Sequence, residues 1–278
     1  MTALRVAQLR AAHQLLDGEP KILHDPVVLR LLEHDAESQI RANAALLNVP
    51  WVLGLRSHVL LRSRYAEDRL ADAAKRGVRQ YVSLGAGFDT FAYRQPDWAH
   101  SLRIFEVDHP ASQQAKRERV EKAGIPIPPN VVFAPIDFEH VSLRDGLASG
   151  GLDFNQPAFF SCLGVLVYLS EEAADGMFRC VGSLPASSEI VFTFSLPDAS
   201  LGPREAEHRA TMSAMVEGMG EPWRTHFDPE LLEQKLRSMG FCEFSVLTAE
   251  EAQGKYFQGR SDGLRASKRR HIASAVVG

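Results

Sequence analysis

A glycine turn and an acidic residue each follow a short apolar run in the middle of the chain. Residues 80–84 lead into Gly85-Ala86-Gly87, and residues 102–107 lead into Asp108. If both runs are neighbouring parallel strands, the turn and the carboxylate meet at the carboxyl edge of the sheet, where open α/β sheets bind nucleotides. Glycine lets the backbone turn sharply and approach a ligand closely. Because a carboxylate can accept hydrogen bonds from both ribose hydroxyls, the pattern indicates an adenosine-containing cofactor.

The spacing of the glycines separates two classes of cofactor. A dinucleotide site requires Gly-x-Gly-x-x-Gly, but Thr90 follows Gly85 and Gly87 at the third position. S-adenosylmethionine has no diphosphate, so a shorter turn is enough for it. A plain strand-to-helix turn is the alternative interpretation of the glycine pair alone. The preceding strand and Asp108 favour S-adenosylmethionine, with an NAD(P)-dependent oxidoreductase as the alternative enzyme.

Four motifs together resemble those of the leucine carboxyl methyltransferase family, including its bacterial small-molecule relatives. The resemblance extends from about Asp25 to the C-terminus. It implies an S-adenosylmethionine-dependent O-methyltransferase with a Rossmann-like, doubly wound α/β sheet of seven strands, the last inserted antiparallel. The motifs are Arg62-Ser63-Arg64-Tyr65, Leu84-Gly85-Ala86-Gly87-Phe88-Asp89-Thr90 closing with Tyr93-Arg94, Phe105-Glu106-Val107-Asp108-His109-Pro110, and Gly164-Val165-Leu166-Val167-Tyr168-Leu169.

The cofactor would contact three strand ends. Gly85, Ala86 and Gly87 form the first turn, and Asp108 is the expected ribose ligand. Asp137 and Phe138 end the third strand, beside the adenine in this fold: Asp137 can accept a hydrogen bond from the exocyclic amine, and Phe138 can pack on the ring. A helix cap is the alternative role of Asp137. Glu106 shares a face with Asp108, and we read it as support for a loop or helix.

Arginines precede the first strand, where the family uses an arginine to hold carboxylates. A planar guanidinium suits bidentate carboxylate binding, and the family pattern favours Arg62 over Arg64. Whether it holds the methionine or the substrate carboxylate is open. Leu163 replaces the glutamate of the protein-modifying members, which favours a small-molecule enzyme and places Leu163 beside the cofactor. Tyr168 is expected near the acceptor, with a core tyrosine as the alternative.

Positioning supplies most of the catalysis when the methyl group is already activated on a sulfonium. A carboxylate acceptor is ionised at neutral pH and needs no base, whereas a phenol or alcohol would want one. His58, His109 and His226 are conceivable bases, but surface or cap positions are the simpler interpretation. Because no metal-ligand set is visible, a magnesium-dependent catechol methyltransferase is a minor alternative.

The composition describes an ordinary soluble protein of 278 residues, with 45% apolar and 24% charged residues. A net charge of -4 argues against a general nucleic-acid binder. Three scattered cysteines (Cys162, Cys180 and Cys242) form neither a disulfide framework nor a zinc site, and fit a reducing cytoplasm. No run approaches the roughly 18 apolar residues of a membrane span. We therefore expect a cytoplasmic enzyme with a small-molecule acceptor, no nucleic acid or membrane partner, and a homodimer as a conceivable assembly. A non-catalytic cofactor-binding partner protein is the alternative from another class.

Helical patterns dominate the first 76 residues, which we expect to form a cap over a methyltransferase core at 77–278. The acid-free basic stretch 1–16 reads as an amphipathic helix that covers something. A helix is expected at 27–33 after Asp25-Pro26, and Pro50 should separate two helices within 40–75. Gly77 would cap the last of them.

Strands and helices then alternate, as in a doubly wound parallel sheet. The stretch 197–227, with Met212, Met215, Met219 and Trp223, departs from the alternation; it is either a lid over the ligand or an ordinary helical insertion. Lys268-Arg269-Arg270 reads as a solvated loop, with a phosphate site as the alternative. Strands are expected at 80–84, 102–107, 131–136, 158–163, 190–195, 241–247 and 271–277, and helices at 112–123, 170–184 and 228–239.

Overall fold

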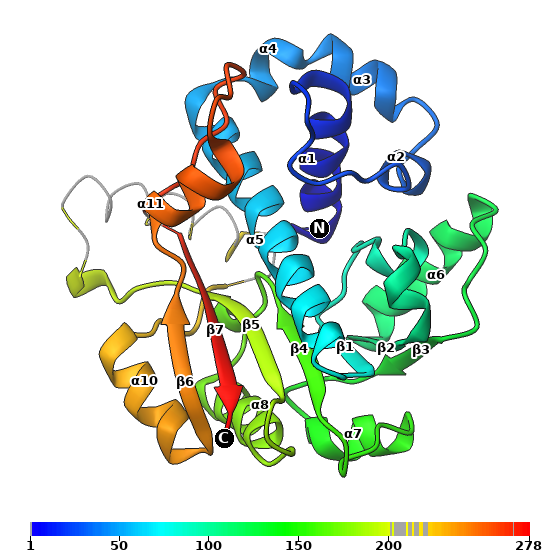
Figure 1. Ribbon diagram of the computed structural model, residues 1–278. Coiled ribbons are helices and arrows are strands. Elements are labelled where there is room, and N and C mark those ends of the chain that lie inside the picture. The colour runs from blue at the N-terminus through cyan, green and yellow to red at the C-terminus, as the bar shows by residue number, and fades with distance from the viewer. Residues whose placement is uncertain are drawn as a thin grey trace.

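One seven-stranded sheet forms the centre of the molecule (Figure 1). The computed structural model describes residues 2–200, 202, 210, 213, 217–218, 222–268 and 270–278. The strand order is β3-β2-β1-β4-β5-β7-β6; β1 to β5 pair in parallel, and β7 is antiparallel to both β5 and β6. The strands are β1 (Gln80–Leu84), β2 (Arg103–Asp108), β3 (Val131–Pro135), β4 (Ala158–Cys162), β5 (Glu189–Phe194), β6 (Phe241–Val246) and β7 (His271–Val277). The predicted seven-stranded, doubly wound sheet with an antiparallel last strand is confirmed.

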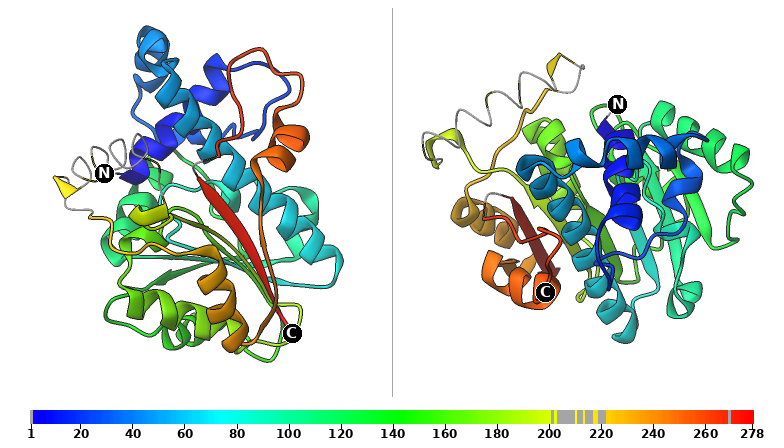
Figure 2. Two further views of the ribbon diagram at one scale, coloured as in Figure 1. Left: turned by 90° about the vertical axis from the view of Figure 1, so that its left-hand side faces the viewer. Right: turned by 90° about the horizontal axis from the view of Figure 1, so that it is seen from above.

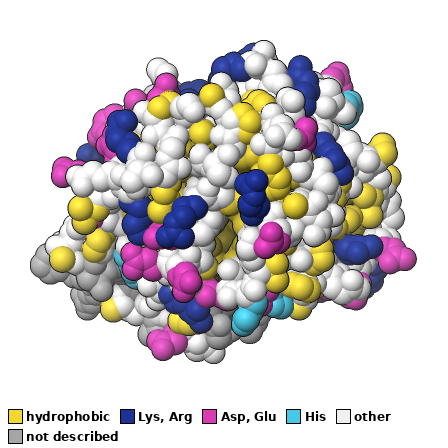
Figure 3. Space-filling view, turned by 90° about the horizontal axis from the view of Figure 1, so that it is seen from below, with side chains coloured by type: hydrophobic (Ala, Val, Ile, Leu, Met, Phe, Trp, Pro, Cys, Tyr) yellow, Lys and Arg dark blue, Asp and Glu magenta, His cyan; other side chains and the backbone are white. Residues whose placement is uncertain are grey.

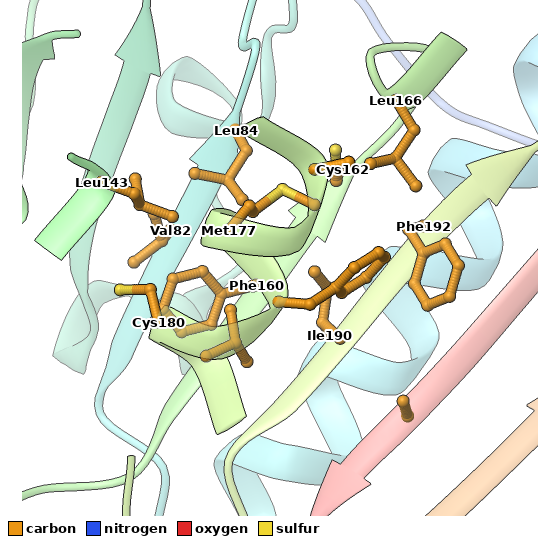
Figure 4. Close-up of a cluster of buried hydrophobic side chains, with 14 of the residues drawn as sticks. Val82, Leu84, Leu143, Phe160, Cys162, Leu166, Met177, Cys180, Ile190 and Phe192 are labelled. Atoms are coloured by element: carbon orange, nitrogen blue, oxygen red, sulfur yellow. The ribbon is translucent and has the colours of Figure 1, made fainter. Parts of the chain in front are cut away.

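Alternating side chains along the strands build a core on each face of the sheet. On one face, Val82, Phe160 and Phe192 pack in one buried cluster beneath α7 (Leu143–Ser149), α8 (Glu171–Gly182) and α10 (Pro229–Ser238) (Figure 4). On the other face, Tyr81 and Phe159 pack with side chains of α5 (Pro50–Lys75). Helix α6 (Pro110–Lys122) packs against β2 and β3. The result is a three-layer arrangement that leaves the carboxyl strand ends at one edge.

Helices near the N-terminus lie over that carboxyl edge (Figures 1 and 2). They are α1 (Thr2–Leu16), α2 (Val28–Leu31), α3 (Ala36–Ala42) and α4 (Ala44–Leu47). Local chemistry explains their boundaries: the Asp25 side chain accepts a hydrogen bond from the amide of Val28 at 3.0 Å, and Pro50 is the first residue of α5. Both helix starts were predicted. The division of the chain into a cap at 1–76 and a core stays a prediction.

Shorter elements complete the described chain. They are the turns of 3₁₀ helix η1 (Phe91–Tyr93), η2 (Asp97–Ser101), η3 (Leu166–Tyr168) and η4 (Asp198–Ser200), together with α11 (Ala249–Ala252) and a π-helical turn, Gln253–Phe257. Met212, Met215 and Met219 lie outside the described residues, so the lid at 197–227 stays a prediction. No helix among the described residues has the length and apolarity to cross a membrane. On the face opposite the N-terminal helices, acidic and basic side chains are interspersed (Figure 3).

Candidate active site

Left-handed backbone at two glycines forms the turn after β1. Gly85 has φ +64° and Gly87 has φ +48°, a region that L side chains rarely adopt. Space is also limiting, because a Cβ on Gly85 would lie 2.2 Å from Cγ2 of Val165 in the loop after β4. The amide of Ala86 donates to the carbonyl of Val107 on β2 at 3.0 Å. The turn therefore lies between the ends of β1 and β4, at the topological switch point of the sheet.

Asp108 ends β2 directly beside this turn. Its Oδ2 accepts a hydrogen bond from the amide of Gly87 at 2.5 Å, and its Oδ1 accepts one from the amide of His109 at 2.7 Å. Desolvation raises the pKa of Asp108, and the two amides partly offset this rise. Because each carboxylate oxygen has two lone pairs, each keeps one acceptor direction. This geometry fits a pair of ribose hydroxyls.

A buried network of charged side chains fastens helix α1 to the segment after the turn. The guanidinium of Arg10 contacts Asp89 at 3.1 Å and donates to the carbonyl of Phe88. Thr90 donates through its hydroxyl to Asp25 at 2.7 Å. A dinucleotide motif has its third glycine at this position, whereas here the Thr90 side chain is used in a hydrogen bond to Asp25.

Arg94 extends the network to α5. Its Nε donates to the Thr90 hydroxyl at 3.0 Å, and its guanidinium forms a two-pronged ion pair with Glu67. Burial would raise the pKa of Asp89, but Arg10 and Arg94 outweigh burial and lower it. Sequence reasoning noted Arg94 within a motif but missed Arg10 and Glu67. The only local signal for Arg10 was the acid-free basic stretch at residues 1–16.

Arg62 projects from α5 to the end of β4. A Cβ on Gly164 would lie 2.4 Å from its Nη1, so the guanidinium lies directly against that glycine. Its Nε is buried and has no hydrogen-bond partner among the described residues. Burial lowers the pKa of Arg62 to about 10, which leaves the side chain charged at neutral pH. Arg64 differs, because it is exposed and pairs with Asp68 at 2.8 Å on the surface of the same helix.

Asp137 and Phe138 follow β3, as predicted from the sequence. Asp137 accepts from the amide of Glu139 at 3.1 Å and pairs with Nδ1 of His140 at 2.9 Å, which together lower its pKa. The capping role of Asp137 is therefore present in a turn, and its contact with adenine stays a prediction. Phe138 is partly buried and packs against the core on the α8 face of the sheet. A turn-forming carboxylate with 31% of its side chain exposed can still accept a further bond.

Glu106 supports a helix, as the sequence indicated. Its Oε1 lies 2.7 Å from Nζ of Lys116 on α6, and Tyr93 donates to Oε2 at 3.2 Å. Both charged side chains are at most 3% exposed. Desolvation raises the pKa of Glu106, while Lys116 opposes the rise. This pair fixes α6 on the sheet and leaves Asp108 as the acid at the edge.

Leu163 and Tyr168 lie on either side of Gly164 in the chain. Both are half-buried, and Leu163 packs against the core on the α5 face. The amide of Gly164 donates to Oγ1 of Thr193 on β5 at 2.7 Å, which fixes the loop after β4. The amide of Arg224 donates to the carbonyl of Val167 at 2.7 Å. That bond brings residues 223–225 beside the turn that carries Tyr168.

The three candidate histidine bases occupy different environments. His109 is the N-cap of α6 and accepts from the amide of Ala111 at 3.2 Å, so its capping interpretation is confirmed. His226 is half-buried. For His58 the surface interpretation is wrong, because it is 7% exposed on the inner side of α5. Desolvation, followed by the charges of Arg270 and Arg62, lowers its pKa well below the usual value.

The basic run before β7 is not uniformly solvated. Lys268 is exposed and pairs with Glu250 at 3.3 Å, as a solvated loop predicts. Arg270 is half-buried, and desolvation lowers its pKa. The solvated interpretation is therefore wrong for Arg270, and Arg269 lies outside the described residues. Within the described part of the chain, no group of three or more His, Cys, Asp or Glu side chains could hold a metal ion.

Cys162 and Cys180 are buried in the apolar cluster shown in Figure 4. Burial raises the pKa of Cys162 to about 12 and that of Cys180 to about 11. Both thiols are therefore protonated at neutral pH, when a cysteine nucleophile requires the thiolate. These cysteines act as packing residues.

Known proteins are similar to this chain in sequence. The leucine carboxyl methyltransferase family model matches residues 3–182. A Bacillus subtilis (strain 168) protein named "Putative S-adenosyl-L-methionine-dependent methyltransferase YktD" is 36% identical over 221 residues, which cover 78% of this chain and 71% of that protein. A Mycobacteroides abscessus protein named "Putative S-adenosyl-L-methionine-dependent methyltransferase" is 31% identical over 242 residues, covering 83% and 73% of the two chains.

Solved structures agree on the fold. A DUF574 family protein from Streptomyces avermitilis superposes with a TM-score of 0.56 and 16% identity, covering 98% of this chain and 97% of that one. A Thermobifida fusca protein described as a "putative methyltransferase" gives a TM-score of 0.56 and 20% identity, with 89% and 92% covered. The family match includes the glycine turn, Asp108, Arg62 and the loop after β4. The chain therefore belongs to the leucine carboxyl methyltransferase family, a family of S-adenosyl-L-methionine-dependent methyltransferases.

Proposed function

We propose that this protein is an O-methyltransferase that transfers a methyl group from S-adenosyl-L-methionine to a carboxylate of a small metabolite. The observation that carries the cofactor assignment is Arg62, a buried cation against Gly164 in the loop after β4 whose Nε has no partner among the described residues. A guanidinium in such a place is suited to a carboxylate, with which it can form two parallel charge-assisted bonds. The match to a carboxyl methyltransferase family supports the carboxylate acceptor. The methyltransferase family match supports the reaction class.

The residues at the carboxyl edge fit the cofactor on two structural grounds. The positive-φ glycines turn the backbone tightly beside Asp108, and Asp108 keeps two acceptor directions for the ribose hydroxyls. In this proposal Gly85, Ala86, Gly87 and Asp108 hold the nucleoside, Asp137 and Phe138 lie at the adenine, and Leu163 lies beside the cofactor. Arg62 binds the methionine carboxylate. When bound, S-adenosyl-L-methionine supplies an activated methyl group that an oxygen nucleophile can take.

The protein's contribution to catalysis would be alignment of the acceptor and exclusion of water. Tyr168, on the turn after β4, is proposed to position the acceptor, because the same loop carries Gly164 against Arg62. A carboxylate acceptor needs no base, since it is ionised at neutral pH. Its methylation should therefore stay nearly constant in rate from about pH 6 to 8, whereas a hydroxyl acceptor with a histidine base should show a rise in rate through this range.

The cofactor class can be tested by thermal unfolding of the full-length protein. S-adenosyl-L-methionine and S-adenosylhomocysteine should raise the melting temperature, because a ligand that binds only the folded state stabilises it. NAD and NADP should leave it unchanged. Stabilisation by NAD or NADP with no response to either adenosyl compound would support the oxidoreductase alternative instead.

The acceptor class can be tested by product analysis. The enzyme is incubated with methyl-labelled cofactor and a pool of small metabolites, and labelled products are separated by mass spectrometry. A methyl ester releases its label on mild base treatment, whereas a methyl ether does not. Labelled ethers alone would refute the carboxylate acceptor and leave the methyltransferase standing. Cofactor binding without any labelled product would favour the non-catalytic alternative.

A further inference from the structure

We propose that Arg270 and His58 form a binding subsite for an anionic oxygen group of the acceptor, next to Arg62 at the carboxyl edge of the sheet. The subsite lies partly outside the region matched by the family model, which ends at residue 182. The assignment to the acceptor rests on the proposed methyltransferase function. Anion binding itself can be measured without any methyl transfer.

The fold places His58 and Arg270 at a similar height in the molecule, toward the carboxyl edge of the sheet. The hydroxyl of Tyr65 on α5 lies 3.4 Å from Oγ of Ser274 on β7. Both elements run away from the carboxyl edge, as Figure 1 shows. From that contact, seven residues back along the helix lead to His58, a rise of about 10 Å. Three residues back along β7 lead to its first residue, His271, roughly 10 Å away, and Arg270 directly precedes it.

A second contact ties the segment before β7 to helix α5. The amide of Arg265 donates to Oγ of Ser57 at 3.2 Å, next to His58 in the chain. His58 also precedes Arg62 by four residues, so the two side chains lie on one face of α5. The charges of Arg270 and Arg62 both act on the His58 imidazole, and the charge of Arg270 acts on Arg62. The three groups are therefore close enough for their charges to interact.

This group has cationic or donor side chains and no paired acid within the described chain. The charged or ionisable groups that act on Arg62 are Arg10, Tyr168, Arg270 and Asp89, and Asp89 is already paired with Arg10. The ionisable groups that act on His58 are Arg270, Arg62 and His271.

His271 adds a further donor position to the subsite. Its ring packs on Phe194 at 5.3 Å, and its Nδ1 is buried with no partner among the described residues.

Like charges that are buried together are costly unless an opposite charge lies between them. In the proposed function, the methionine carboxylate satisfies Arg62 alone. Arg270 would then remain without a counter-charge, beside the uncharged imidazole of His58. An anionic group on the acceptor supplies it, and Trp223 and Tyr168 adjoin the same edge through the backbone bond from Arg224 to Val167. The acceptor class is therefore a small organic anion.

The test is calorimetric titration of the full-length protein with three probes: sodium benzoate, its neutral isostere benzamide, and inorganic phosphate. Titrations are made with and without saturating S-adenosylhomocysteine, so that Arg62 can be occupied by the cofactor. Benzoate should bind at least tenfold more tightly than benzamide in both states. Another outcome is that phosphate binds more tightly than benzoate and loses this binding in the Arg270→Ala variant. In that case the subsite stands and the acceptor group is a phosphate.

Arg270→Ala should weaken benzoate or phosphate binding at least tenfold, whereas Arg270→Lys should retain part of it. Arg265→Ala is the matched control, because Arg265 is an exposed arginine of the same segment. Arg270→Ala should not lower the melting temperature, since it removes a half-buried cation without an ion-pair partner. Equal binding of benzoate and benzamide, or equal binding by the Arg270→Ala and Arg265→Ala variants, would overturn the proposal.

The pH dependence gives a second readout. Burial and the surrounding charges lower the pKa of His58 in the free protein, and a bound anion should raise it. Anion binding should then take up a proton and strengthen as the pH falls from 8 to 6. His58→Gln should remove this dependence. If the protein methylates an acceptor but does not bind benzoate, the subsite alone is rejected. If the protein binds benzoate but does not bind S-adenosylhomocysteine, the proposed function alone is rejected.

Discussion

Replacing Arg62 by methionine should stabilise the free protein while weakening cofactor binding. Methionine is apolar and uncharged, and its unbranched side chain reaches about as far as Nε of arginine. The wild-type side chain keeps a buried Nε without a partner among the described residues, and a buried unsatisfied polar group costs about 1–3 kcal/mol. Arg62→Met should therefore raise the free energy of unfolding of the apo protein by an amount of this order.

The same change should weaken the binding of S-adenosylhomocysteine, which retains the methionine carboxylate. Hydrogen bonds to charged groups contribute about 1.5–3 kcal/mol, which corresponds to roughly a 10- to 100-fold increase in the dissociation constant. Urea denaturation measures the stability, and titration calorimetry measures the affinity. Arg64→Met is the matched control, because Arg64 is exposed and paired with Asp68 on the same helix. It should change neither quantity by more than about 0.5 kcal/mol.

Two outcomes would refute this reasoning. If Arg62→Met lowers the stability of the apo protein by more than 1 kcal/mol, roughly the size of a typical net hydrogen bond, the guanidinium has structural partners that the described contacts do not include. If the affinity for S-adenosylhomocysteine is unchanged, Arg62 does not hold the methionine carboxylate. Arg62→Lys separates charge from geometry. It keeps the cation and loses the bidentate fork, so turnover should fall although the protein folds.

Three further changes test the rest of the edge. Asp108→Ala should weaken S-adenosylhomocysteine binding at least tenfold in a calorimetric titration with the fold intact, and an unchanged constant would remove Asp108 as the ribose ligand. Gly85→Ala should lower both cofactor affinity and melting temperature, because its Cβ would meet Val165 at 2.2 Å at φ +64°; wild-type values would show that the turn can relax. The free energy of unfolding should fall as the pH drops from 7 to 5, because burial lowers the pKa of His58, His13 and His271 below their unfolded value near 6.5 and the unfolded chain then binds more protons. In denaturation series across this range, His58→Gln should reduce the slope by at most about 1.4 kcal/mol per pH unit, and an unaltered slope would place the proton uptake elsewhere.

The sequence could predict the strands because their apolar runs are short, continuous and bounded by turn residues. The range 80–84 coincides with β1, and residues 102–107 differ from β2 by one position at each end. Helix starts were readable where a proline or a capping acid marks them, as at Pro50 and Asp25. These signals are local, and the parallel order then follows from the alternation of strands and helices.

Contacts between distant segments could not be predicted in this way. Arg10 and Asp89 are separated by 79 positions, and Glu67 and Arg94 by 27. No local pattern indicates that such charges will be paired, because the pairing depends on how α1 and α5 dock on the turn. His58 was misread for a related reason: a lone histidine has no periodicity of its own, and its burial comes from the helix face on which it lies.

Arg270 shows how a run of like residues can hide different environments. In Lys268-Arg269-Arg270 the side chains look alike in the sequence, yet Lys268 is exposed and Arg270 is half-buried. The difference comes from the start of β7 at His271, which brings Arg270 against the carboxyl edge. A pattern of charge identifies a basic segment, whereas the direction of each side chain depends on the strand that follows.

The charges along the carboxyl edge are arranged to suit a nucleoside at one end and anionic groups at the other. Beneath the turn, Asp89 and Glu67 are paired with Arg10 and Arg94, so these charges are satisfied within the protein. At the edge, Asp108 offers two acceptor directions, and Arg62 and Arg270 form no ion pair in the described chain. In the proposed assignments, an acceptor-rich end therefore meets ribose hydroxyls, and a donor-rich end meets two anions. A positively charged sulfonium lies between a nucleoside and a carboxylate, which makes an anionic acceptor favourable for charge as well as for reactivity.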